Sequence, residues 1–156
     1  MKKLTSSLLI IATLLFTIQA GELERSLTSA HYRITLIIGS IPKMLTPEQA
    51  KRATSGEVMV GNSMNMSADP KNANAHLEVA IADKASGKLI TNLMPTIVVT
   101  DASGKASKLE MLMTMYDVKT GPTDTHFGQN IFLARGQHSV RVTVKGETVV
   151  FKNITR

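Results

Sequence analysis

Short runs in which apolar and polar residues alternate cover much of this chain. The clearest is the segment 76–83, HLEVAIAD, which places Leu77, Val79 and Ile81 on one face. His76 and Glu78 fall on the opposite face, and this two-residue period is that of a half-buried β-strand. Further strands, rich in β-branched residues, are predicted at 31–38, 89–101, 107–117, 130–134, 138–145 and 148–155, and the segment 57–66 is predicted to be a short strand that runs into a loop.

Turn sequences separate these runs at short intervals. They are rich in Gly, Asn, Asp and Pro, the residues that favour tight turns, and they stand at 67–75, 84–88, 102–105 and 146–147. About seven to nine short strands separated in this way predict an all-β fold, namely an immunoglobulin-like β-sandwich. The chain contains no cysteine, so it lacks the disulfide of a true immunoglobulin domain.

One short helix is predicted near the N-terminal end of the sandwich. Thr46 and Gln49 have the spacing of a capping box, and Pro47 occupies the first helical position. The helix should run from Pro47 to about Ala53 and end near Gly56.

The first twenty residues have the pattern of a secretory signal peptide. Two lysines precede an apolar run from Leu8 to Ile18, and the small residue Ala20 closes the segment. The run is shorter than the roughly 20 residues that a membrane helix needs, so cleavage is predicted, with an uncleaved membrane anchor as the alternative. The mature chain, 21–156, is then one periplasmic domain that is large enough for its own core.

The charge of the chain argues against a nucleic-acid partner. Without the two lysines of the signal segment, the net charge is +4 instead of +6, and the basic residues are scattered. The chain holds only two Tyr, four Phe and no Trp. A surface for nucleic acid needs a basic stripe with stacking aromatic residues, and this sequence shows neither.

Motifs for catalysis are also missing from the sequence. It contains no Gly-x-Ser-x-Gly nucleophile elbow, no glycine-rich phosphate loop and no cysteine nucleophile. The acidic residues are scattered, without a pair spaced for acid–base chemistry. The chain is therefore predicted not to be an enzyme, and a hydrolase or redox enzyme is the last-ranked alternative.

Methionine is the unusual residue of this chain. Nine methionines occur, eight of them after residue 20, and Met111, Met113 and Met115 share one face of a predicted strand. A thioether is a soft ligand that suits Cu(I), but methionine also fills gaps in cores. Met111 is predicted to be a core residue, whereas core and ligand roles stay open for Met113 and Met115. Met64 and Met66 repeat the spacing in a polar segment.

Two of the four histidines stand where a scaffold usually carries a site, at a strand end or in a loop. His76 begins its strand, with Glu78 on the same face as a further ligand or a partner of the ring. His126 falls in a predicted loop, where Asp124 could orient its ring and Gly128 is expected to adopt a positive φ. Imidazole is the commonest metal-ligand side chain, so both histidines are candidate ligands.

These segments together resemble a known family. HLEVAI, a Met-x-Met strand, and HFGQN followed by G-x-x-x-V-x-V are similar to the periplasmic accessory proteins of bacterial high-affinity iron uptake. Members of that family are dimeric immunoglobulin-like sandwiches that bind copper through His and Met and assist iron transport across the inner membrane. The resemblance covers about residues 76–145, and it implies that His76, His126 and either Met113 or Met115 are metal ligands.

The sequence thus predicts an exported, soluble metal-binding protein. Copper, as Cu(I) or Cu(II), is the expected ion and iron is the alternative, with His76, Met113, Met115 and His126 as candidate ligands. An inner-membrane metal transporter and a second copy of the chain are the expected partners. The competing hypothesis is an envelope interaction module without metal, in which the methionines form a core and the two histidines lie far apart.

Overall fold

The computed structural model describes residues 22–60 and 70–156, and these residues form a β-sandwich. The strands are β1 (Leu23–Thr28), β2 (Tyr32–Gly39), β3 (Met44–Leu45), β4 (Glu57–Met59), β5 (Ala75–Asp83), β6 (Thr96–Thr100), β7 (Ala106–Lys108), β8 (Met113–Asp117), β9 (His126–Ile131), β10 (Gln137–Val144) and β11 (Glu147–Thr155). One helix, α1 (Pro47–Ala50), and one 3-10 turn, η2 (Pro122–Asp124), complete the described elements.

The strands form two sheets that face each other. The larger sheet has seven strands in the order β1-β2-β5-β9-β8-β4-β3, and the smaller has four in the order β11-β10-β6-β7. Pairing is antiparallel except between β3 and β4, which run parallel. This arrangement confirms the predicted all-β sandwich. No helix of the described part is long and apolar enough to cross a membrane.

The main core lies between the two sheets and consists of the inward faces of the alternating strands. Leu77, Val79 and Ile81 of β5 are at most 1% exposed, and they pack with residues such as Phe127 of β9 and Phe151 of β11. Seventeen buried residues belong to this one cluster. Because successive side chains of a strand point to opposite faces, the residues between these core positions point to the outer face of each sheet. This outer face carries the polar side chains.

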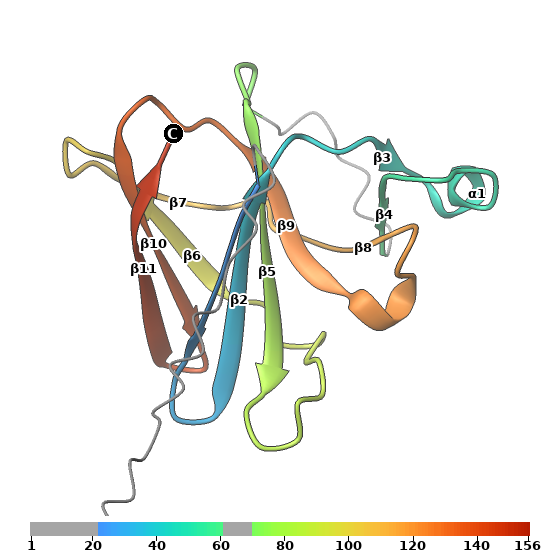
Figure 1. The fold of residues 1–156 in the computed structure, drawn as a ribbon, viewed down its shortest axis with the longest axis horizontal. Coiled ribbons are helices and arrows are strands. Elements are labelled where there is room, and N and C mark those ends of the chain that lie inside the picture. The colour runs from blue at the N-terminus through green and yellow to red at the C-terminus, as the bar shows by residue number, and fades with distance from the viewer. Residues whose placement is uncertain (1–21, 61–69) are drawn as a thin grey trace, which may run out of the picture.

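The seven-stranded sheet extends beyond this core as a wing made of β8, β4, β3 and α1. Figure 1 shows these elements to one side of β9, away from β10 and β11. Leu45, Val58, Met59 and Met115 of the wing are buried but do not belong to the main core cluster. Met59 is opposite Met115, so these two lie on the same face of the sheet, whereas Leu45 and Val58 lie on the other face.

The helix prediction is confirmed at its start. Thr46 accepts a hydrogen bond from the Gln49 backbone, and the Gln49 side chain accepts one from the Thr46 backbone, so the capping box is complete. The helix is shorter than predicted, because α1 ends at Ala50 and turns follow before Gly56.

Several strand boundaries differ from the prediction. The segment 107–117 is not one strand, because β7 pairs with β6 in the small sheet and β8 pairs with β9 in the large one. The chain crosses between the layers at 109–112, a step that alternation alone does not reveal. β1 was not predicted, since it is an exposed edge strand that pairs only with β2. The short strand predicted at the start of the segment 57–66 is β4, which ends at Met59, and 61–69 lie outside the described residues.

Gly56 holds the junction between β3 and β4 in place, and its replacement gives a test of the wing. Its φ is +123°, and an added Cβ would lie 2.6 Å from the Lys43 carbonyl oxygen. We expect Gly56→Ala to lower the free energy of unfolding by about 3 kcal/mol or more, from strain plus this clash. Urea denaturation measures the loss.

Gly87→Ala is the matched control for this substitution. Gly87 also has a positive φ, +73°, but nothing lies within 4 Å of an added Cβ. Its expected loss is about 1–2 kcal/mol, from the left-handed backbone alone. Equal losses for the two variants would contradict the claim that close packing fixes the β3–β4 junction.

Candidate metal centre

Gly128 lies at the middle of a polar cluster on the outer face of the seven-stranded sheet. It is opposite Glu78 on β5 and opposite Met113 on β8. In the adjoining rows, His76 is opposite Asn130 and Met115 is opposite His126. Directly opposed residues of a sheet point to the same face, so the register of three strands brings all these side chains together.

His76 and Met115 share the space above Gly128. A Cβ added to this glycine would lie 2.8 Å from Nε2 of His76 and 3.1 Å from Sδ of Met115. Both side chains are buried, at 1% and 0% exposed. The missing side chain of Gly128 therefore makes the room in which an imidazole nitrogen and a thioether sulfur meet.

Two carboxylates and a second histidine complete the cluster. Nε2 of His126 lies 3.2 Å from Oε2 of Glu57 and 3.7 Å from Oε2 of Glu78. The other oxygen of Glu78 lies 3.9 Å from Nε2 of His76. One donor atom each from Glu57, Glu78 and His126 lies within 4.8 Å of the others. Glu78 therefore lies between the two histidines, with one carboxylate oxygen near Nε2 of His76 and the other near Nε2 of His126.

Both imidazoles are oriented through their Nδ1 atoms. Nδ1 of His76 lies 2.7 Å from Oδ1 of Asn130, and Nδ1 of His126 lies 3.1 Å from the backbone carbonyl of Asp124. A carbonyl oxygen can only accept, so each Nδ1 donates and each Nε2 carries the lone pair. This is the usual way in which proteins fix the tautomer of a metal-binding histidine.

The cluster retains protons because its acidic groups are buried and lie close together. Burial is the main cause that raises the pKa of Glu78 from 4.5 to about 7; His126 opposes the shift, and repulsion from Glu57 and other nearby acids adds to it. Burial alone would lower the pKa of His126, but the carboxylates of Glu57 and Glu78 outweigh it and raise that pKa above its ordinary value. A cation is therefore favoured at the centre of the cluster, whether it is a proton or a metal ion.

A hollow of about 630 Å³ leads to this cluster from the surface. Its lining contains five of the chain's twelve acidic residues and, within the described part, neither lysine nor arginine: Glu22, Glu57, Glu78, Asp117 and Asp124. The whole chain is basic, so this concentration of carboxylates is local. The field at the mouth of the hollow attracts cations and repels anions.

The structure brings three of the four predicted ligands together. His76, His126 and Met115 converge at the cluster, which places both histidines near the same Glu78 carboxylate. Met113 is half-buried and lies opposite Gly128, beside the cluster. Because the Met115 sulfur occupies the space beside the His76 ring, Met115 is the better placed of the two methionines.

Other details of the sequence prediction were wrong. His126 is the first residue of β9 and not a loop residue, and Gly128 lies inside that strand without a positive φ. Met111 is 40% exposed and not part of the core. Asp124 does orient the His126 ring, as expected, although it does so through its backbone carbonyl. The predictions for Met64 and Met66 stay untested, because these residues lie outside the described part of the chain.

Sequence reasoning missed Glu57 and Asn130. Glu57 is only 5% exposed although it is charged, but it is about 70 residues away from His126 in sequence, and only the β4–β8–β9 pairing brings the two together. The isolated acid at the start of a strand carried no local signal. Asn130 follows His126 by four residues in an alternating strand, so it was detectable as a residue on the same face.

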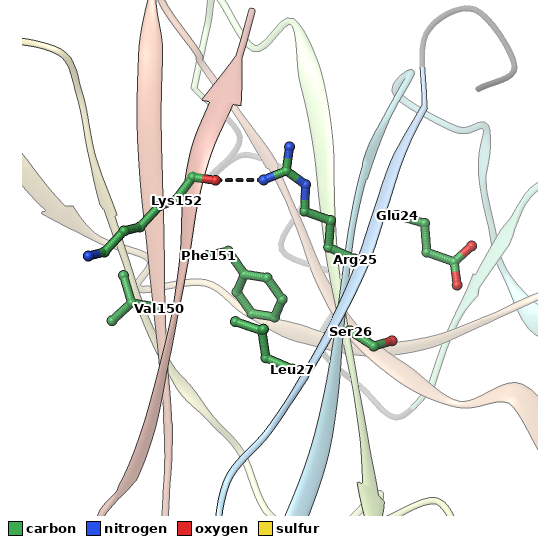
Figure 2. A pocket seen from close by; sticks show the side chains of 7 residues that line it. All are labelled: Glu24, Arg25, Ser26, Leu27, Val150, Phe151 and Lys152. Atoms are coloured by element: carbon green, nitrogen blue, oxygen red, sulfur yellow. Dashed lines mark hydrogen bonds between the residues drawn. The ribbon is translucent and has the colours of Figure 1, made fainter. Parts of the chain in front are cut away.

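A different hollow, of about 480 Å³, lies along the edge strands β1 and β11. Figure 2 shows Leu27 and Phe151 between these strands, with the Arg25 side chain reaching the Lys152 carbonyl. The Arg25 guanidinium donates to the carbonyls of Lys152 and Asn153, at 2.6 and 3.2 Å, and so ties the two sheet edges together. This hollow lacks the converging donors of the cluster at Gly128, which is the stronger candidate site.

Comparison with known proteins adds no identity: no family model, curated protein or solved structure matches this chain.

The shared protons make a prediction for the metal-free protein. A folded-state pKa near 7 for Glu78 means that its contribution to stability is present below pH 4.5 and is lost between pH 4.5 and 7. The raised pKa of His126 acts in the same direction, since that contribution is lost as the pH rises through the folded-state pKa. We expect the free energy of unfolding to fall by about 2–3 kcal/mol between pH 5 and pH 8.

Urea denaturation in the presence of a chelator measures this fall. Glu78→Gln removes the main titrating group, so its stability should change much less over the same interval. An equal fall in the variant and the parent chain would place the effect elsewhere in the molecule.

Proposed function

We propose that this chain is an exported metal-binding protein that holds a copper ion at the cluster around Gly128. The observation that carries the proposal is the buried convergence of His126 Nε2 with Glu57 and Glu78, beside His76 and Met115. In this assignment His76, Met115 and His126 are ligands, as the sequence suggested, and the two glutamates add oxygen donors.

The donor atoms fit a metal ion in two respects. Nε2 of His126 and Oε2 of Glu57 are buried and lie 3.2 Å apart, and neither has another hydrogen-bond partner among the described residues. Buried polar atoms normally have such partners, because an unsatisfied one costs about 1–3 kcal/mol. An ion between them would satisfy both atoms at once. The His126 tautomer, with its proton on Nδ1, is already the one that presents Nε2 as a ligand.

Copper is the ion that the mixed donors support best. The thioether of Met115 is a soft donor that suits Cu(I), and imidazole suits copper in both oxidation states. The carboxylates of Glu57 and Glu78 favour harder ions, so they would support Cu(II) when the ion is oxidised. Iron(II) is the second candidate, since a histidine with two carboxylates resembles the oxygen-rich sites that this ion prefers.

We assign the protein a role in carrying or presenting metal, not in catalysis. The acidic hollow would concentrate cations outside the cell membrane and lead them to the buried donors. The ion would displace the protons that the cluster holds, so binding would release protons to the medium. An inner-membrane metal transporter is the partner we propose, together with a second copy of the chain.

The direct test is a titration of residues 21–156 with Cu(I) and Cu(II) against a competing chelator. We expect one tightly bound ion per chain, and at least about a tenfold loss of affinity in His126→Ala and in His76→Ala, because each removes a ligand. Glu57→Gln should weaken Cu(II) more than Cu(I), since the carboxylate is the harder donor.

His31→Ala and Met94→Leu are the matched controls. His31 pairs with Glu147 away from the cluster, and Met94 is 57% exposed. Both variants should bind copper as the parent chain does. The proposed site would be contradicted if His76→Ala and His126→Ala bound copper as tightly as the parent chain, or if the two controls lost as much affinity as they do. Either result would favour a binding module without metal.

A further inference from the structure

β1 forms one edge of the seven-stranded sheet, and among the described residues it pairs only with β2. The hairpin between the two strands sets their hydrogen bonds, because the backbone N–H of Ser29 donates to the Tyr32 carbonyl at 2.9 Å. Opposed residues of an antiparallel pair alternate between bonded and non-bonded positions. Every second residue of β1 therefore turns its backbone groups away from β2, and these residues are Glu24, Ser26 and Thr28.

A side-chain contact agrees with this alternation. The hydroxyls of Ser26 and Thr35 lie 2.7 Å apart, as expected for a non-bonded pair, in which the facing side chains lie closer together. The backbone N–H and C=O groups of Glu24, Ser26 and Thr28 therefore lie along the open edge of the sheet. An unpaired edge of this kind accepts another extended segment as a further strand.

The remaining residues of β1 point to the inside of the sandwich, since each is opposite a core residue of β2: Leu23, Arg25 and Leu27. Leu27 is 38% exposed, and together with buried Phe151 of β11 it borders the hollow of about 480 Å³ beside this edge. Figure 2 shows Glu24 and Ser26 on the other side of β1 from Leu27 and Phe151. A strand added to β1 would therefore present every second side chain to the hollow.

Arg25 determines the charge that fits at this edge. Its guanidinium donates to the carbonyls of Lys152 and Asn153, which are neutral groups. None of the ion pairs among the described residues includes Arg25. Two of its N–H groups are in use, so others remain to donate. An acidic side chain opposite Arg25 would pair with this positive charge.

We propose that the open edge of β1 binds an extended peptide segment of a partner protein, whose inward side chains are apolar, acidic and apolar in turn. The acidic side chain would lie opposite Arg25, and the apolar ones opposite Leu23 and Leu27. The backbone of the segment would pair with Glu24, Ser26 and Thr28. This inference is independent of the copper proposal, because neither the pairing nor its test involves a metal ion.

A second copy of β1 fits this edge less well than such a segment. The inward residues of β1 are Leu23, Arg25 and Leu27, so a second β1 strand in antiparallel pairing can place only leucine or arginine opposite Arg25. Arginine opposite arginine is unfavourable, and leucine leaves the positive charge unpaired. The charge of Arg25 therefore favours a partner with an acidic residue.

Two short peptides with blocked ends test the proposed pattern. The first, Thr-Val-Thr-Asp-Thr-Val-Thr, places its valines and aspartate on one face, and the second has lysine in place of aspartate. We expect the aspartate peptide to bind the purified chain at least about tenfold more tightly in an NMR titration, because lysine would face Arg25. Hydrogen exchange should slow at the amides of Glu24, Ser26 and Thr28, whereas those of Arg25 and Leu27, which already bond to β2, should change little.

Two variants and a modified peptide serve as controls. Arg25→Gln should bind the two peptides with similar affinity. Arg141→Gln, which changes an exposed arginine of β10, should discriminate between them as the parent chain does. An aspartate peptide that is methylated on the backbone nitrogens of the two threonines beside the aspartate should not bind, since it lacks the donors for pairing.

The proposal would be overturned if the parent chain bound the aspartate and lysine peptides equally, or bound neither at their highest soluble concentration. Slow exchange at Glu24, Ser26 and Thr28 without any peptide would also overturn it. If that protection increased with protein concentration, a second copy would cover the edge. If it did not, a segment of the same chain would cover it.

Discussion

The cluster around Gly128 has to overcome the repulsion among its acidic groups. The carboxylates of Glu57 and Glu78 converge on the His126 imidazole at the inner end of the acidic hollow, and carboxylates this close together need positive charge between them. The raised pKa values of Glu78 and His126 show that, in the metal-free chain, protons supply part of this charge. A metal ion would do the same more completely, since it contacts several donors at once.

The fold holds these donors in place through strand register. β5, β9 and β8 each place alternate residues on the outer face, and the wing adds Glu57 from β4, which pairs with β8. Gly128 is essential to this arrangement because any side chain there would occupy the space of the His76 nitrogen and the Met115 sulfur. The main core between the sheets contains none of these candidate ligands, so the cluster can be varied without repacking that core.

The all-β sandwich, the capping box and most strands were predictable from alternation and turn residues. His76, Met115 and His126 were also predictable as candidate ligands, because histidine and spaced methionines on strands carry a chemical signal in a chain without cysteine. Glu57 was not, since its role depends on a pairing between distant strands. The crossing at 109–112 and the space above Gly128 on the outer face likewise arise from tertiary packing, which a two-residue hydrophobic period does not reveal.

The measurement that tests the central claim most directly is X-ray absorption spectroscopy of the Cu(I)-loaded chain, compared with the same spectrum of Met115→Leu. The account predicts one sulfur neighbour together with nitrogen or oxygen neighbours in the parent chain, and loss of that sulfur in the variant. A parent spectrum without sulfur, or a sulfur neighbour that survives in Met115→Leu, would contradict the assignment of the cluster around Gly128 as the copper centre.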